Sequence, residues 1–306
     1  MKTLLFTLIL LIIPGGGYSY AVERRGNGNF VFFYHPENEP KVAPLMENAQ
    51  GYRARILEML SLDDDSTIEV HVAADEEEMG AILGGGRVQE WVAGLAIASE
   101  NRVILSAKGS SLFTIEDTFV HEIAHIYLAK KAGKGGLPRW FNEGFAMLLA
   151  GEPVIDRLKT ALRAAIFKNL IRLEELEKSF PAGEPNVHLA YAESLIFMKF
   201  LISKYSMGKI VKIIGETDGV GFRAAFKKTT GDEIDDVERE WLDELEKPSL
   251  IFNIFSDWSV LWAGITVLFI IAYAIKKTRA KKKVRMWEIQ EELETIRRNQ
   301  RDDLIN

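Results

Sequence analysis

The sequence of 306 residues contains no cysteine, so no disulfide framework can stabilise the fold and no cysteine-based latency switch is available. The same absence leaves the redox character of the compartment undetermined. An excess of basic charge is also lacking, because 38 lysines and arginines face 44 aspartates and glutamates, for a net charge of −6. General nucleic-acid binding needs a basic surface, so no nucleic-acid partner is expected. With 47% hydrophobic residues, the chain can nevertheless bury a sizeable core.

Histidine is scarce, and its placement is informative. Five histidines occur in the whole chain, and two of them lie in His121-Glu122-Ile123-Ala124-His125. Residues four apart share one face of a helix, so both imidazoles can face a single metal ion. Zinc accepts imidazole nitrogens and carboxylate oxygens, and its catalytic sites use three protein ligands with a fourth position open. The spacing therefore predicts His121, His125 and the downstream Glu143 as Zn²⁺ ligands and Glu122 as a general base.

The competing interpretation of this motif is a surface helix with two solvated histidines. The flanking sequence disfavours it, because apolar residues on both sides predict a buried helix. These residues are Leu112, Phe113, Ile115, Phe119, Val120, Ile123, Ala124, Ile126 and Leu128. Buried polar side chains need partners, and a bound metal ion would supply them.

The motif and its surroundings resemble a known family. The run from Thr118 to Gly151 contains Leu137-Pro138-Arg139-Trp140 and Asn142-Glu143-Gly144-Phe145-Ala146, and it resembles the gluzincin metallopeptidases, most closely the bacterial peptidase MA-like group. The second segment is also similar to aminopeptidase-N-type enzymes. Weaker similarity continues through Ala190-Tyr191-Ala192-Glu193-Ser194 and from Phe226 to Trp241, so that roughly residues 94–247 are covered. The resemblance implies a zinc-dependent peptidase with the ligands and the base named above.

Two features of related enzymes are absent. Aminopeptidases of that clan carry Gly-x-Met-Glu-Asn, whereas the nearest segment here is Ile97-Ala98-Ser99-Glu100-Asn101, which a hairpin turn explains better. Thermolysin-like relatives place an aspartate four residues after the third ligand, where it orients a histidine. Met147 occupies that position here, so the orienting contact must come from elsewhere or be absent.

Both ends of the chain are hydrophobic. Residues 1–21 combine a lysine, a short apolar core and small residues, which is typical of a secretory signal peptide, with an uncleaved anchor as the alternative. Trp258 to Ile275 is free of charge, would span about 27 Å as a helix, and predicts a transmembrane helix. The basic tail, residues 276–306, marks the cytoplasmic side. We therefore expect a single-pass cell-membrane protein with an extracytoplasmic catalytic domain.

The order of the expected elements indicates an α+β fold. A small sheet in residues 22–112 precedes a mostly helical metal-binding part in residues 113–248, as in the gluzincins. The edge of Arg102–Ser106, the strand before the metal-binding helix, is predicted to pair with an extended substrate peptide. The predicted strands are Phe30–Tyr34, Thr67–Val72, Gly94–Ala98 and Arg102–Ser106, and the predicted helices among them are Val42–Leu60 and Glu76–Leu83.

The expected function is a membrane-anchored zinc metallopeptidase, in which Glu122 assists the attack of a zinc-bound water on a peptide bond. The oxyanion that develops needs a donor. Tyr191 is the first candidate and His188 the second, with a packing role as the alternative for the tyrosine. Glu193 and Arg139 could orient site residues, but structural or surface roles are favoured. A zinc-containing binding or scaffolding module is the alternative function, and a zinc enzyme acting on a non-peptide amide is a third.

Overall fold

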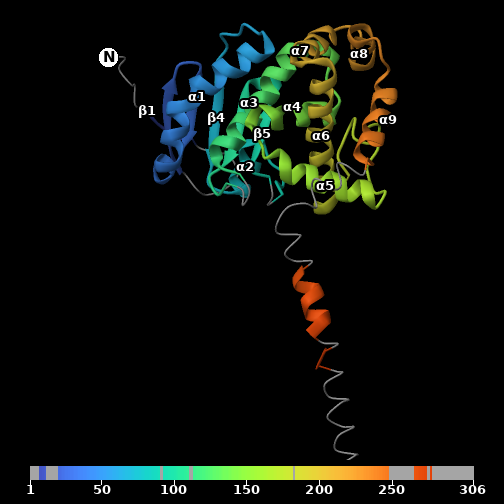
Figure 1. Ribbon diagram of the computed structural model, residues 1–306. Helices are drawn as coiled ribbons and strands as arrows, with labels where there is room; N and C mark the ends of the chain where they lie inside the picture. The colour runs from blue at the N-terminus through green and yellow to red at the C-terminus, as the bar shows by residue number, and fades with distance from the viewer. Residues whose placement is uncertain are drawn as a thin grey trace, which may run out of the picture. The chain divides into compact units, whose positions relative to one another are not determined.

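The computed structural model describes residues 7–11, 20–89, 92–109, 113–181, 183–247, 265–273 and 276–277. The chain divides into two compact units, Met1–Glu246 and Lys247–Asn306. The candidate functional residues all lie in the first unit, which is described below (Figure 1).

Within the described residues, one mixed sheet has the strand order β1-β2-β3-β4-β6-β5. Its strands are β1 (Thr7–Leu11), β2 (Tyr20–Asn27), β3 (Phe30–Tyr34), β4 (Ile68–Ala73), β5 (Gly94–Ile97) and β6 (Arg102–Ser106). The neighbours β3, β4 and β6 run parallel, and the other neighbouring pairs are antiparallel. Burial alternates along β3, where Phe30, Phe32 and Tyr34 are buried, as the two-residue period of a strand requires.

Helices cover both faces of the sheet and form the C-terminal part of the first unit. They are α1 (Glu39–Leu60), α2 (Glu76–Ile82), α3 (Ile115–Ala132), α4 (Arg139–Ala150), α5 (Val154–Ile166), α6 (Glu184–Tyr205), α7 (Met207–Glu216), α8 (Phe222–Thr230) and α9 (Ile234–Leu245). Phe119 of α3 contacts Phe30 of β3, with ring centroids 5.4 Å apart, whereas Met79 of α2 packs with Ile104 of β6 on the opposite face. Figure 1 shows α3 between the sheet and helices α4 and α6.

Local sequence explains how the two helices that carry the metal motif are placed. Helix α3 begins at a capping box, in which the amide of Asp117 donates to Thr114 Oγ1 (3.1 Å) and the amide of Thr114 donates to Asp117 Oδ2 (3.0 Å). The glycine-rich turn Gly133–Gly135 then reverses the chain into α4. Gly144 lets α4 approach α6 closely, because a Cβ atom there would lie 2.3 Å from the carbonyl oxygen of Ser194.

The predicted α+β layout is confirmed, but one expectation about the sheet is wrong. Strand β6, Arg102–Ser106, is hydrogen-bonded to β4 on one side and to β5 on the other, so it offers no free edge. On that side β5 is the outermost strand in the part of the chain that the structure describes. The turn interpretation of Glu100-Asn101 is confirmed, since Ala98–Glu100 form a short 3-10 turn and Glu100 pairs with Arg102 at 2.8 Å.

The structure gives no support to the signal peptide and the transmembrane helix that were predicted at the two chain ends. Residues 7–11, inside the predicted signal peptide, form strand β1 on β2, because an apolar run of this length also suits a strand. Of the predicted transmembrane helix, residues 258–275, only the helical residues 265–273 are described. Among all described residues, we find no helix with the length and apolar character needed to cross a membrane. The tail beyond residue 277 lies outside the described residues.

Candidate metal centre

Helices α3 and α4 bring the three predicted ligands together. His121 and His125 lie one turn apart on α3, and their ring centroids are 4.7 Å apart. Glu143 comes from the first turns of α4, and its Oε2 atom lies 3.3 Å from Nε2 of His121 and 3.5 Å from Nε2 of His125. The ligand atoms of the three residues all lie within 4.8 Å of one another.

This geometry fits a zinc ion. Tetrahedral zinc with bonds of about 2.0–2.1 Å places neighbouring ligand atoms about 3.3–3.4 Å apart. The two distances from Glu143 Oε2 to the histidine nitrogens, 3.3 and 3.5 Å, match that separation. Two imidazoles and one carboxylate are also a donor set that catalytic zinc sites use, with one position left for water or substrate. His121, His125 and Glu143 therefore form a candidate Zn²⁺ site.

Each ligand has a second contact on the side away from the common centre. Nδ1 of His125 lies 3.0 Å from Asn142 Oδ1. Oε1 of Glu143 lies 3.4 Å from Nε of Arg139, which is thus at the site and is not merely a surface charge. Nδ1 of His121 lies 3.6 Å from Oε1 of Glu152. An outer partner of this kind fixes the tautomer and orientation of a metal-binding imidazole.

Glu122, the predicted general base, lies beside the ligands and is 8% exposed. It is close to the start of β5, because a Cβ atom added to Gly94 would lie 2.8 Å from Glu122 Cγ and 2.9 Å from Oε1. A side chain at position 94 would therefore displace the carboxylate. The absence of a side chain at Gly94 leaves Glu122 room beside the outermost strand.

The pKa values of the cluster show how its charges interact. Burial lowers the pKa of His121, but contacts with Glu143 and Glu152 outweigh burial and raise it to about 10. Burial would raise the pKa of Glu143, yet the two histidines lower it, so this carboxylate is anionic and suited to a cation. Burial raises the pKa of Glu122, and the histidines oppose that shift. A raised pKa brings a carboxylate closer to the range in which it can both accept and return a proton.

Tyr191 of α6 lies near the candidate ligands, because the charges of Glu143 and Glu122 both affect its pKa. Burial, followed by the charge of Glu143, raises the pKa of Tyr191, so its hydroxyl stays protonated near neutral pH. Its ring packs against Phe180, with centroids 5.0 Å apart. His188, one turn earlier on the same helix, is exposed. Tyr191 is therefore the better of the two predicted donors.

Glu193 has a structural role, as favoured from the sequence. The backbone amide of Ile171 donates to its Oε1 atom at 3.0 Å, and the amide of Leu173 donates to Glu238 at 2.8 Å. These two buried carboxylates tie the segment after α5 to α6 and α9. Burial raises the pKa of Glu193 to about 8.

We expect the free energy of unfolding to decrease as pH rises from about 4.5 to about 8. In that interval the folded chain keeps a proton on Glu193 that the unfolded chain releases, so rising pH favours unfolding by an amount on the order of a few kcal/mol. Glu193→Gln cannot ionise and should flatten this dependence. Thermal unfolding at several pH values would measure it, with the exposed Glu174→Gln as the control. Equal pH slopes in the parent and Glu193→Gln would contradict the assignment.

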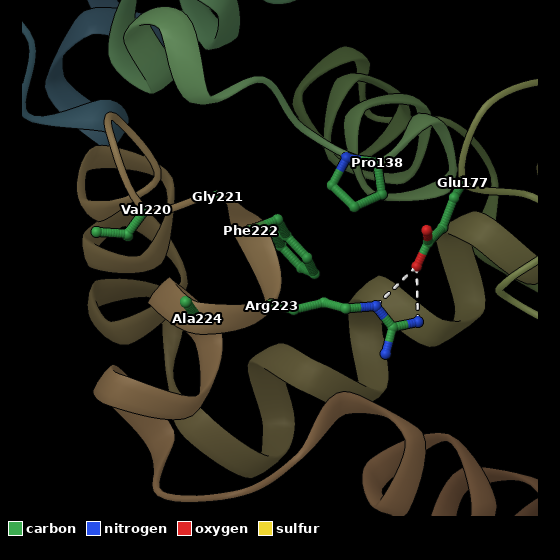
Figure 2. A pocket seen from close by; sticks show the side chains of 7 residues that line it. All are labelled: Pro138, Glu177, Val220, Gly221, Phe222, Arg223 and Ala224. Atoms are coloured by element: carbon green, nitrogen blue, oxygen red, sulfur yellow. Dashed lines mark hydrogen bonds and ion pairs between the residues drawn. The ribbon is translucent and has the colours of Figure 1, made fainter.

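A surface hollow of about 410 Å³ lies apart from these residues, between the start of α4 and the start of α8 (Figure 2). Figure 2 shows Arg223 extending across it toward Glu177, to which Nη2 donates at 2.7 Å. Asp235 also pairs with this arginine, at 2.8 Å. No predicted ligand or donor lines the hollow, so it is not the candidate site. Its lining residues are Pro138, Glu177, Val220, Gly221, Phe222, Arg223 and Ala224.

A comparison with family models agrees with the sequence resemblance. A family model described as the peptidase MA superfamily matches residues 55–247, more than half of the chain. Two solved structures of yeast leukotriene A4 hydrolase are similar. The native enzyme from Saccharomyces cerevisiae is 16% identical over 78% of this chain and 38% of its own, with a TM-score of 0.41. The bestatin complex is 15% identical over 84% and 44%, with a TM-score of 0.42.

This chain thus spans less than half the length of either leukotriene A4 hydrolase chain. A search of curated proteins gives no match.

Proposed function

Because the chain belongs to the peptidase MA superfamily, we propose that it is a gluzincin-type zinc metallopeptidase that hydrolyses peptide bonds. The prediction of a peptidase MA-like family is confirmed by the family match. The observation that carries the proposal is the convergence of His121, His125 and Glu143, at separations that suit zinc, beside the buried Glu122.

The residues around the site can divide the reaction among them. A zinc ion at this site would polarise the scissile carbonyl and lower the pKa of a bound water. Glu122 would accept a proton from the attacking water and later deliver it to the leaving amine. Tyr191 would donate a hydrogen bond to the oxyanion that develops on the carbonyl oxygen. Arg139 and Asn142 would hold Glu143 and His125 in place.

Cleavage of a mixed peptide library by the full-length chain would test the proposal. Cleavage should stop when a chelator removes the metal and should return when zinc is added. The cut sites would distinguish endopeptidase from exopeptidase action. A chain that binds zinc stoichiometrically and cleaves no peptide would contradict the proposal and favour the alternative, a zinc-containing binding or scaffolding module.

Tyr191→Phe should lower kcat about 100-fold, because the oxyanion loses a donor whereas the ring and its packing remain. KM and zinc content should change little, since the hydroxyl is not among the ligands. Steady-state kinetics and metal analysis would show both effects. Tyr205→Phe is the matched control, because this second tyrosine of α6 donates to Asp232 instead. An unchanged kcat for Tyr191→Phe would contradict the donor role and leave Tyr191 with a packing role alone.

We propose that substrate pairs with β5 and not with β6. Strand β5 is the outermost described strand on that side of the sheet, and an extended peptide can add to such an edge through its backbone. Gly94, the first residue of β5, lies against Glu122 and Thr118. A peptide paired with β5 would therefore pass directly beside the general base.

Methylating the backbone nitrogens of the substrate residues next to the cut bond should lower kcat/KM about tenfold. Each lost backbone hydrogen bond costs about 0.5–1.5 kcal/mol, and about 1.4 kcal/mol corresponds to a factor of ten. The control is the same peptide methylated far from the cut bond. Equal cleavage of both peptides would exclude strand pairing.

We also propose that residues 258–275 anchor the chain in the cell membrane, with the catalytic unit outside the cytoplasm and the basic tail inside. The uncharged stretch followed by lysines and arginines supports this topology. A tag at the C-terminus should become accessible to protease only after the membrane is permeabilised. Accessibility in intact cells would contradict this orientation.

A further inference from the structure

We propose that Glu152, held by Arg157, is the positioning residue that orients the His121 imidazole toward the metal. This inference rests on the proposed zinc site. Glu152 would take the role of the orienting aspartate of thermolysin-like relatives, because Met147 occupies the position of that aspartate here. Met147 is fully buried and has no carboxylate, so any acceptor that orients His121 has to be a different residue.

Each of the other two candidate ligands has a polar partner on the side that faces away from the metal position. His125 has Asn142 at its Nδ1 atom, and Glu143 has Arg139 at its Oε1 atom. An imidazole that binds metal through Nε2 carries its proton on Nδ1, and an acceptor there fixes both the tautomer and the ring plane. Glu152 Oε1, 3.6 Å from Nδ1 of His121, is the carboxylate oxygen on that side of the ring.

Glu152 is built into the site and is not a mobile surface charge. Its side chain is 7% exposed, and a carboxylate this buried needs a compensating cation. Arg157 supplies it, with Nη2 donating to Oε2 at 3.0 Å from a side chain that is itself 14% exposed. The two oxygens of Glu152 thus have separate partners, the imidazole at Oε1 and the guanidinium at Oε2.

The chain turn at the end of α4 explains how a residue nine positions after Glu143 reaches the first histidine. Gly151 ends α4 in the left-handed conformation, with φ 74°, and the amide of Glu152 donates back to the carbonyl of Met147 at 3.1 Å. This turn directs Glu152 back toward α3. Helix α5 then begins, and Arg157 in its first turns completes the pair.

Zinc affinity of the full-length protein, measured by competition with a chromogenic chelator, tests the inference. Glu152→Ala and Glu152→Gln should each raise the zinc dissociation constant about 10- to 100-fold. Glu152→Asp should recover part of the loss, and Arg157→Gln should weaken binding because it frees Glu152. Asp156→Asn is the matched control, since this exposed carboxylate lies between the pair in sequence and should leave affinity unchanged. The absorption spectrum of the cobalt-loaded proteins should change for the Glu152 variants but not for Asp156→Asn.

Thermal unfolding of the metal-free proteins separates orientation from simple stabilisation. If Glu152 only joins α4 to α5, its variants would unfold at lower temperature yet bind zinc like the parent, and the inference would be wrong. If the parent chain itself bound no zinc, the proposed metal centre would fail instead.

Discussion

Replacing Glu122 with glutamine is expected to reduce peptide hydrolysis by on the order of 1,000-fold or more while zinc stays bound. The amide has nearly the shape of the carboxylate and is not a ligand, so the metal site should be preserved. It cannot take a proton from the attacking water, and general-base catalysis contributes typically about 10²–10⁴-fold. In the metal-free site, burial raises the pKa of Glu122 and so favours proton uptake by the carboxylate, which glutamine cannot perform.

The measurement combines kcat/KM with zinc content in the same preparation. Glu116→Gln is the matched control, because this glutamate of α3 lies on the same helix but accepts a hydrogen bond from Tyr52 (2.7 Å) and is not among the candidate site residues. Its activity should equal that of the parent. Full activity in Glu122→Gln would mean that another group takes the proton, and zinc loss would mean that Glu122 supports the ligands instead.

The cluster of candidate metal ligands could be predicted from sequence because its arrangement is local. His121 and His125 are four positions apart, and helical geometry alone places them on one face. Glu143 required only that a second helix return beside the first, and the glycine-rich turn Gly133–Gly135 makes that return. The four predicted strands are confirmed for the same reason, because a strand pattern lies in consecutive residues. In β3, for example, every second residue is buried.

Features that depend on distant pairing could not be predicted in this way. Arg102–Ser106 has the pattern of a strand, but whether it lies at an edge depends on where Gly94–Ile97 pairs. Strand β2 was missed because its charged sequence lacks an apolar alternation. The approach of Glu152 to His121 depends on the direction in which the chain leaves α4 at Gly151. Only that glycine at the helix end could have signalled a turn.

Replacing Glu143 with glutamine is expected to weaken zinc binding on the order of 1,000-fold. Glu143 is the one carboxylate among the three candidate ligands, and its lowered pKa shows that its charge already attracts the two histidines. Removing one partner of a buried ion pair typically costs about 3–5 kcal/mol, and every 1.4 kcal/mol is about tenfold in affinity. The neutral amide would also leave Arg139 facing the histidines without the carboxylate that now separates them.

A ligand role and a structural role of Glu143 predict different outcomes for stability. A ligand binds zinc only in the folded chain, so adding zinc should raise the melting temperature of the parent much more than that of Glu143→Gln. Glu143→Asp keeps the charge but shortens its reach, and should fall between the two. If zinc stabilised Glu143→Gln as strongly as the parent, the third ligand would have to be another residue.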